Sequence, residues 1–338
     1  MMKLFKITCV MLLVASFSFP LFAAGEKATD SGAQEKIVLR WSDTNAENDE
    51  IVVASKRFAE SVKEKTDGRI QIEVFPSGQL GDNMEVLKAL QMGAIDITRV
   101  KPGHLSDLGL KGTQVYSLPY IFEDLEHARR VLRSDLGMQI LDGIQKEGEK
   151  LVGLGYYANA PRSFFFRDKK VSTLDDMKGL KIRVMPGQIY VDLAESFGAS
   201  ATPMAFSELY SALQTGVVDG AEQPVKGFYA QKFYEVCKYF TFDNHQADPS
   251  IVVISEMTWN SLSKEDQALL KETLSEASLW FDDTMDVIID EYIEELKNEG
   301  VVFSEVEDMH LWQAAAQELY KVYGEGFEEE IAEINNLR

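Results

Sequence analysis

The feature that most restricts how this chain can fold is one long amphipathic segment in its C-terminal third. Ser263, with Asp266 three residues later, is typical of a helix start, and Gly300 is typical of a helix stop. The spacing of apolar residues between these limits predicts a single unbroken helix. These residues recur at steps of three and four, at Leu270, Leu274, Ala277, Phe281, Met285, Ile288, Tyr292 and Leu296.

The length of this predicted helix bears on the number of lobes. About 36 residues in helical conformation extend roughly 54 Å, which is more than one small lobe can span. We therefore expect the helix to lie across two lobes of the same molecule. A coiled coil with a partner chain is the alternative, and the spacing alone leaves it open. The chain has 338 residues, which also suits two lobes of ~100–150 residues each.

Strand and helix patterns alternate from Ile37 onward, with helices predicted over 51–65 and 83–92. This alternation indicates an α/β architecture with largely parallel sheets. Ligands of such sheets bind beyond the carboxyl ends of the strands, so the loops there are the expected place for a site. The predicted strands cover 37–41, 70–75, 94–100, 151–157, 162–167, 181–184 and 251–255.

The first residues of the chain predict export. Lys3 and Lys6 introduce an apolar run of 16 residues over 7–22, and small residues follow it. This is the layout of a cleavable secretory signal peptide. A membrane anchor is the alternative, but the run is shorter than the ~20 residues that a spanning helix needs. We expect 1–24 to be removed, 25–36 to be a flexible tether and the mature protein to be periplasmic, although the pattern does not define the cleavage position.

Charge and cysteine content exclude several classes of protein. The formal net charge is −21, and loss of residues 1–24, which carry two lysines and no acids, makes it −23. Such a charge argues against a nucleic-acid partner and against electrostatic binding to a membrane surface. The only cysteines are Cys9 and Cys237, so a disulfide scaffold is excluded. Cys237 alone would remain after cleavage, and we expect it to be a small buried apolar residue.

No motif for catalysis, a metal or a cofactor is recognisable in the sequence. The four histidines are widely spaced, and neither an H-E-x-x-H nor a C-x-x-C pattern occurs. The phosphate-binding loop, the dinucleotide fingerprint and the nucleophile elbow are also missing. We therefore predict no catalytic residue, no metal and no cofactor.

Arginines in apolar surroundings are the remaining chemical signal. Arg183 lies between Ile182 and Val184 in a short predicted strand, and Arg162 and Arg167 flank a run of aromatic residues. A guanidinium in such a place needs an anion, and its planar fork suits a carboxylate. A salt bridge to one of the many acids is the alternative for each arginine. The residues alone predict no more than an anion site.

The middle of the chain resembles the solute-binding proteins of tripartite ATP-independent periplasmic (TRAP) transporters, a family of dicarboxylate and sialic-acid receptors. The order and spacing of the matching segments agree over roughly residues 37–310. The central segments are 177–184 (MKGLKIRV), 198–224 (GASATPMAFSELYSALQTGVVDGAEQP) and 231–236 (QKFYEV), with weaker matches at 76–81, 93–98 and 117–122.

This resemblance implies a fold. It is the two-lobed α/β binding-protein fold of the Venus-flytrap kind (type II-like), with a long helix spanning both lobes. Lobe I is expected to hold 37–160 and 249–288, and lobe II 161–248 and 289–338. The long helix argued from the apolar spacing agrees with this implication independently.

The resemblance also implies ligand-binding residues in lobe II. Arg183 matches the strand arginine that forms a bidentate pair with the ligand carboxylate, and Arg162 matches a second arginine some twenty residues earlier. Gln223 stands where the family commonly has Asn, and this longer side chain changes the expected geometry. Phe206 matches an aromatic residue that packs on the ligand.

Lobe I is expected to set specificity. Asn83 falls at a ligand-facing position of the family, and His245 aligns with a residue at the pocket edge. Arg99 and Lys101 follow a strand where sialic-acid relatives have an acidic residue. These two cations indicate a second anionic group on the ligand. The alternative is that both point outward and pair with surface acids.

The resemblance implies a receptor that delivers a small carboxylate solute to the small and large membrane subunits of a permease. Sugar acids such as hexuronates and aldonates are the first expectation for the solute, followed by C4-dicarboxylates and then keto acids. A periplasmic enzyme or a sensor co-receptor on the same fold is the competing class, because fold does not define function. A monomer without a nucleic-acid partner is expected.

Overall fold

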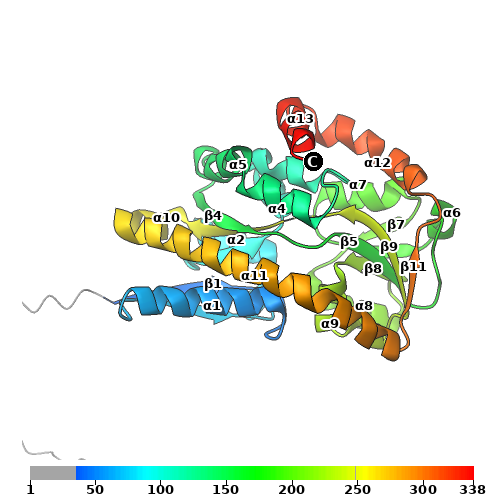
Figure 1. The fold of residues 1–338 in the computed structure, drawn as a ribbon, viewed down its shortest axis with the longest axis horizontal. Helices are drawn as coiled ribbons and strands as arrows, with labels where there is room; N and C mark the ends of the chain where they lie inside the picture. Colours follow the sequence, from blue (N-terminus) through cyan, green and yellow to red (C-terminus); the bar gives the residue numbers. More distant parts are fainter. Residues whose placement is uncertain (1–35, 248) are drawn as a thin grey trace, which may run out of the picture. The chain divides into compact units, whose positions relative to one another are not determined.

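The computed structural model describes residues 36–247 and 249–338, so the predicted signal peptide and nearly all of the predicted tether lie outside it. Two mixed sheets organise the described chain, and each defines a lobe (Figure 1). Lobe I contains the five-stranded sheet, in the order β2 (Ile70–Phe75), β1 (Ile37–Ser42), β3 (Ile97–Val100), β10 (Ser250–Ser255) and β4 (Leu151–Tyr157). Lobe II contains the six-stranded sheet, in the order β11 (Val302–Glu305), β9 (Tyr239–Gln246), β5 (Arg162–Phe166), β8 (Gly220–Gln223), β6 (Lys181–Val184) and β7 (Ser200–Pro203).

The prediction of largely parallel sheets is confirmed, with one antiparallel strand in each lobe. β1 pairs in parallel with β2 and β3, but β10 runs antiparallel to both β3 and β4. In lobe II, β6 is parallel to β7 and β8, whereas β5 is antiparallel to β8 and β9. The chain reaches β5 from lobe I and β10 from lobe II. No crossover helix on the same sheet therefore imposes a parallel direction on these two strands.

Helices cover both faces of the lobe I sheet. Alternate residues of β10 show this, because Ile251 and Val253 belong to one buried apolar cluster and Val252 and Ile254 to another. The first cluster is closed by α2 (Asn83–Gln91), α3 (Pro102–Leu108), α4 (Leu125–Arg133) and α5 (Asp135–Lys146), and the second by α1 (Glu50–Lys65), α10 (Glu256–Ser261) and α11 (Lys264–Asn298).

The lobe II sheet is covered in the same way. Phe164 and Phe166 of β5 point into one cluster, and Phe165 between them points into the other. Burial of each such side chain contributes ~1.5–3 kcal/mol to folding. The first cluster is closed by α7 (Gln188–Ser196) and α12 (Met309–Tyr323), and the second by α8 (Leu209–Thr215), α9 (Val225–Ala230) and the end of α11.

The long helix is confirmed as α11, and it spans both lobes (Figure 1). The Ser263 side chain accepts a hydrogen bond from the Asp266 backbone at its start, and Gly300 adopts a φ of +85° just after its end. The Asp266 carboxylate forms an ion pair with Arg69. The apolar stripe is buried within this molecule: its first five members lie in the lobe I core, and Leu296 lies in the lobe II core.

The C-terminal helices connect the two lobes a second time. Trp312 of α12 lies in the lobe II core, whereas Ile334 of α13 (Glu328–Asn336) lies in the lobe I core. His127 of α4 lies 2.8 Å from the Ile334 carbonyl oxygen through its Nε2 atom. The expected assignment of the whole range 289–338 to lobe II therefore differs from the packing of α13.

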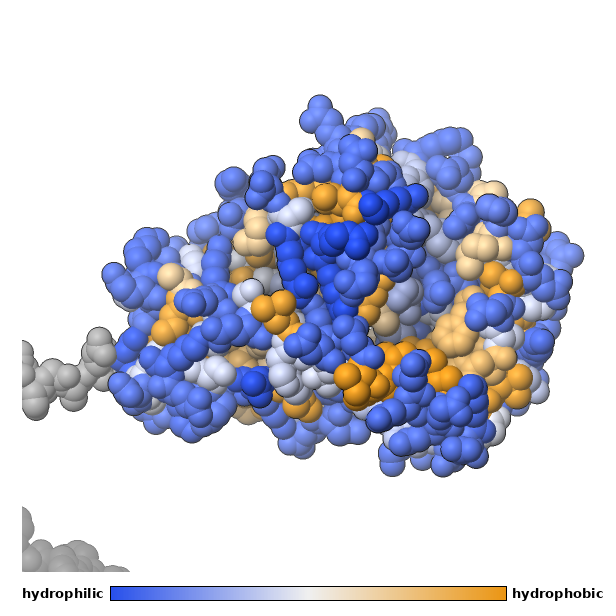
Figure 2. Space-filling model, in the orientation of Figure 1, coloured by the Kyte–Doolittle hydropathy of each residue, from blue (hydrophilic) through white to orange (hydrophobic). Residues whose placement is uncertain are grey.

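The surface agrees with the acidic composition. Hydrophilic residues cover most of the face shown in Figure 2. Among the described residues, no helix is both long and apolar enough to cross a membrane. Cys237 is buried in lobe II as expected, and burial raises the pKa of its thiol to about 12.

Candidate functional site

A cavity of about 590 Å³ lies between the two lobes. In lobe I its walls come from the segment after β1, the start of α2 and the end of β3; in lobe II they come from β5, β6, β8 and the segment after β7. Its place beyond strand ends follows the rule for open α/β sheets. Seven of the eight predicted ligand-binding residues line it, namely Asn83, Arg99, Lys101, Arg162, Arg183, Phe206 and Gln223.

Arg183 is a buried cation that pairs with none of the acidic side chains in the described part of the chain. Its side chain is held on β6, and the residue is only 1% exposed. Nε and Nη2 both donate to the Met204 carbonyl oxygen, at 3.1 and 2.8 Å, whereas Nη1 has no hydrogen-bond partner among the described residues. Burial lowers the pKa of Arg183 to about 10, with Glu222 opposing and Arg162 adding to the effect. The salt bridge considered as the alternative is not formed, and the side chain is arranged to receive an anion.

Arg162 differs from Arg183 because its charge is already compensated. It lies on β5, and its Nε atom pairs with the Glu222 carboxylate of β8. Nη2 also donates to the Glu222 carbonyl oxygen at 3.2 Å. The pair places an acid and a base side by side at the wall of the cavity, next to Arg183.

Phe206 and Gln223 complete the lobe II wall. The ring centroid of Phe206 lies 5.7 Å from Cζ of Arg183, within the range of a cation–π contact. Gln223 ends β8, where it pairs with Ser163. Its Oε1 atom points toward Gly227, at which a Cβ atom would lie only 2.9 Å away. A larger residue at 227 would therefore displace the Gln223 amide from this position.

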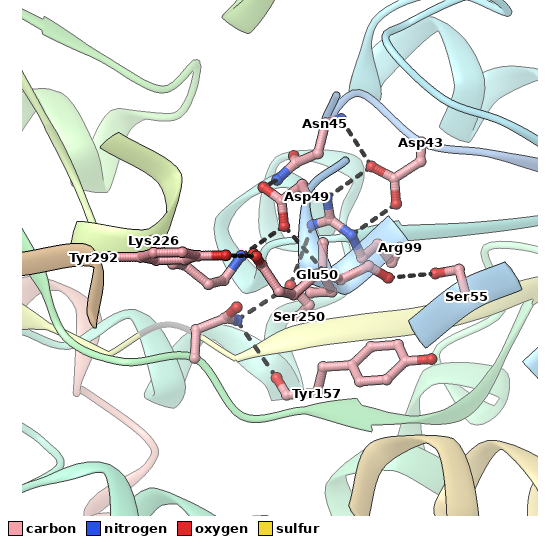
Figure 3. Close-up of polar contacts among 12 residues, drawn as sticks. Asp43, Asn45, Asp49, Glu50, Ser55, Arg99, Tyr157, Lys226, Ser250 and Tyr292 are labelled. Atoms are coloured by element: carbon pink, nitrogen blue, oxygen red, sulfur yellow. Dashed lines mark hydrogen bonds and ion pairs between the residues drawn. The ribbon is translucent and has the colours of Figure 1, made fainter. Parts of the chain in front are cut away.

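Arg99 lies neither on the surface nor unpaired in the cavity. It is 7% exposed, and its Nε and Nη2 atoms donate to both carboxylate oxygens of Asp43, at 2.8 and 2.7 Å (Figure 3). Nη1 donates to Ser250 at 3.2 Å. The expected surface ion pair is replaced by this buried bidentate pair, whereas the contact of Arg99 with a ligand stays a prediction. Lys101 borders the cavity immediately before α3, and Asn83 does so at the first residue of α2.

His245 is the predicted site residue that does not line the cavity. It is buried in β9, where its Nδ1 atom lies 2.7 Å from Asp243 and its ring stacks on Phe164 at 4.5 Å. Its Nε2 atom lies 3.9 Å from the Glu222 carboxylate that pairs with Arg162. His245 thus lies next to the Arg162–Glu222 pair without lining the cavity, in place of the expected position at the pocket edge.

An ion pair between the lobes was missed by the sequence reasoning. Lys226 of α9 in lobe II places Nζ 2.8 Å from Oδ1 of Asp49, which precedes α1 in lobe I (Figure 3). Asp49 also caps α1 by accepting from Ile51, and it accepts from Asn45 at 2.7 Å. Burial alone would raise the pKa of Asp49, but the Lys226 and Arg99 charges lower it overall. Asp49 could be recognised as a helix cap in the sequence, whereas nothing there pointed to Lys226.

The chemistry that this arrangement supports is binding of an anion. Basic side chains border the cavity from both lobes, and Arg183 offers an unpartnered donor. Over residues 36–247 and 249–338, no group of three or more His, Cys, Asp and Glu side chains is placed to hold a metal ion. The geometry therefore describes a receptor site for a small carboxylate.

Comparison with known proteins identifies the family. The model of the bacterial extracellular solute-binding proteins, family 7, matches residues 41–327. The C4-dicarboxylate-binding protein DctB of Bacillus subtilis is 30% identical, with 98% of each chain covered. The sialic acid-binding periplasmic protein SiaP of Vibrio cholerae is 32% identical over 80% of this chain and 83% of its own.

Solved structures agree with this relationship. A TRAP periplasmic solute-binding protein from Pseudomonas putida F1, with bound D-glucuronate, has a TM-score of 0.85 and 30% identity, over 88% of this chain and 97% of that one. One from Polaromonas, bound to D-erythronate, has a TM-score of 0.84 and 28% identity, over 88% and 98% of the two chains. The chain therefore belongs to the family 7 bacterial extracellular solute-binding proteins, which are receptors and not enzymes.

Proposed function

We propose that this protein is the periplasmic receptor of a TRAP transporter and binds a sugar acid with a single carboxylate between its two lobes. The observation that carries the proposal is the unpartnered Nη1 atom of Arg183, buried at the wall of the interlobe cavity. A carboxylate at this atom would supply the hydrogen bond and the opposite charge that the buried guanidinium lacks.

The pairing of the other cations favours one carboxylate on the ligand. Arg99 is neutralised by Asp43, Arg162 by Glu222 and Lys226 by Asp49. A second carboxylate at any of these three cations would have to compete with its buried acidic partner, so Lys101 is the cation at which the alternative is tested. Solved relatives with bound D-glucuronate, β-D-galacturonate and D-erythronate support the same class of ligand.

Individual residues receive roles in this proposal. Arg183 binds the carboxylate, and Phe206 packs on the ligand beside it. The Gln223 amide forms a hydrogen bond with the ligand from the lobe II side. Arg162 orients the wall through Glu222 and faces the same region. Asn83 and Lys101 contribute polar contacts from lobe I.

Transport and export complete the proposed function. The signal peptide at 1–24 is cleaved on export, and the mature receptor delivers its ligand as a monomer to the small and large permease subunits. Membership of family 7 and the matches to TRAP binding proteins support this arrangement.

A thermal-shift screen of organic acids tests the ligand class, because binding raises stability by RT ln(1 + [L]/Kd). D-glucuronate, D-galacturonate, D-gluconate and D-erythronate should raise Tm more than succinate, malate or pyruvate at equal concentration. Stabilisation by succinate and malate alone would support the alternative, a C4-dicarboxylate receptor, which the likeness to DctB favours. In that case Lys101→Glu should abolish succinate binding.

A further inference from the structure

His104 is a second buried residue of the cavity wall that carries an unpartnered polar atom. It lies on α3, is 1% exposed and lines the cavity wall. Its Nδ1 atom has no hydrogen-bond partner anywhere in the described chain. Buried polar atoms are nearly always bonded, so an unpartnered atom in a residue of the cavity wall is a candidate to bond a ligand.

The other buried histidines show what a structural histidine looks like in this chain. His127 accepts a hydrogen bond from the Glu123 backbone at Nδ1, and its Nε2 atom lies 2.8 Å from the Ile334 carbonyl oxygen. His245 has Asp243 at Nδ1. Both have Nδ1 partners within the protein, whereas the Nδ1 atom of His104 has none.

The charge state of His104 defines what it can recognise. Burial lowers the pKa of His104 to about 3, and the charges of Arg183, Lys101 and Arg162 act in the same direction. The ring is therefore neutral near neutral pH, and each of its nitrogens either donates or accepts one hydrogen bond. A neutral ring suits a hydroxyl group and offers no charge to a second carboxylate.

His104 and the preceding Gly103 contact Tyr190 of lobe II, so α3 lies where the two lobes meet. Gly103 donates its backbone N–H to the Tyr190 hydroxyl of lobe II at 3.2 Å. A Cβ atom at residue 103 would lie 2.5 Å from the Tyr190 ring, so only glycine permits this approach. The His104 ring meets the same tyrosine edge-on at 6.5 Å. α3 is thus positioned by a contact from the lobe that carries Arg183.

We propose that His104 is a specificity-determining residue: its Nδ1 atom forms a hydrogen bond with a hydroxyl group of the ligand whose carboxylate contacts Nη1 of Arg183. The pocket then selects hydroxylated monocarboxylates, because an alkyl acid would bury the same carboxylate and leave Nδ1 unbonded. This inference rests on the proposed function and adds to it the residue that recognises a hydroxyl group of the ligand.

Calorimetry on a matched set of ligands and variants tests the inference. The ligands are D-glucuronate and its single-deoxy analogues, and the variants are His104→Phe and His104→Gln, with exposed His310→Phe as the control. His104→Phe keeps a ring against Tyr190 but removes both nitrogens. It should weaken D-glucuronate binding by ~5- to 150-fold, the cost of an unpaired buried polar group. The analogue that lacks the hydroxyl bonded to His104 should bind wild type ~5- to 150-fold more weakly than D-glucuronate does. The affinities of wild type and His104→Phe for this analogue should agree within ~3-fold.

Separate outcomes distinguish this inference from the proposed function. D-glucuronate affinity unchanged in folded His104→Phe would overturn the inference and leave the proposed function standing. An equal loss for D-glucuronate and every deoxy analogue would show a purely structural role and would also overturn it. Failure of wild type to bind any sugar acid would overturn the proposed function, and the inference with it.

A measurement on the wild-type protein keeps the test independent of folding in the variants. The imidazole ¹⁵N shifts of His104 should move when D-glucuronate is added, because Nδ1 gains a hydrogen bond. The shifts of His127 should stay in place, because both of its nitrogens already have partners. An unchanged His104 signal at saturating D-glucuronate would overturn the inference even if no variant folds.

Discussion

Lys226 and Asp49 form a buried ion pair across the two lobes, with Nζ 2.8 Å from Oδ1 and exposures of 3% and 0%. Lys226 also lies 5.7 Å from the ring centroid of Phe281 on α11. Both charges are solvated if the lobes separate, and they compensate each other only while the lobes are together. The pair is therefore an electrostatic contact that favours the arrangement in which the two lobes lie together.

Removing one member of this pair should weaken ligand binding. Lys226→Met leaves Asp49 buried and uncompensated in the closed form, and breaking a buried pair costs ~3–5 kcal/mol. Because the open form hydrates the carboxylate, part of that cost should appear as a rise in Kd for D-glucuronate of at least ~10-fold. Calorimetry measures this rise.

The double variant is the control for the ion pair. Asp49→Asn retains a side chain that caps helices well, so the start of α1 should be preserved. Combined with Lys226→Met it should recover most of the lost affinity, giving a positive coupling energy in a double-mutant cycle. Additive losses would mean that the pair has no part in closure.

Arg183 should be irreplaceable by lysine. Loss of a desolvated, charge-assisted hydrogen bond costs ~2–5 kcal/mol, so Arg183→Ala should raise Kd roughly 30-fold to several thousand-fold. Arg183→Lys should not rescue binding, because one ammonium cannot keep the bonds to Met204 and also present the donor now supplied by Nη1. Near wild-type affinity of Arg183→Lys in calorimetry would contradict the assignment.

Local patterns in the sequence predicted the elements well, because they depend on neighbours along the chain. The apolar spacing from Leu270 to Leu296 defined α11, and the unbroken β-branched run from Ile251 to Ile254 marked β10 as a strand. The direction of β10 within its sheet was not predictable, because it depends on the chain returning from lobe II. The same limit applies to α13, whose apolar face packs on the other lobe.

The candidate site was predictable only where a family motif carried it. The residues alone singled out Arg183 and Arg162 as cations in apolar surroundings, and the resemblance added Phe206 and a ligand-binding role for each, which stays a prediction. The partners of these cations were not predictable, since Glu222 is one of 55 acidic residues and Asp49 lies 177 residues from Lys226. His104 was indistinguishable from any other lone histidine until its unbonded Nδ1 atom and its neighbours were placed in space.

Arg99 should be needed for stability more than for ligand contact. Arg99→Met removes the bidentate partner of Asp43, which is almost fully buried, and should destabilise the protein by ~3–5 kcal/mol. Adding Asp43→Asn should restore part of the loss, because no uncompensated charge then remains. Urea unfolding measures both effects. A fully stable Arg99→Met protein that has lost only ligand affinity would show instead that Arg99 contacts the ligand.

Ligand should also change the shape of the protein in solution. A site between two lobes favours the closed form by its differential affinity for that form. Small-angle scattering should give a smaller radius of gyration with saturating D-glucuronate than without it, and Lys226→Met should need more ligand to reach the same value. Identical scattering profiles in both states would place the ligand within one lobe.

Acid should remove the contribution of Asp49 only at low pH. The pKa of Asp49 in the folded protein lies below its ordinary value of 3.8, because the charges of Lys226 and Arg99 outweigh the effect of burial. A lowered carboxylate pKa adds stability that is present above the unfolded value and is lost as pH falls through the folded value. The stability difference between wild type and Asp49→Asn should therefore be constant from about pH 5 to about pH 8 and should shrink below about pH 4. The pKa of His104 is lowered from its ordinary value of 6.5 to about 3 in the folded protein, so only the unfolded chain binds this proton between these values. Both proteins should therefore lose stability as pH falls through about 6.5, and this common effect cancels in the difference between them. Urea unfolding of both proteins at several pH values measures the difference, and a change in that difference centred near pH 6.5 would contradict the assignment of Asp49.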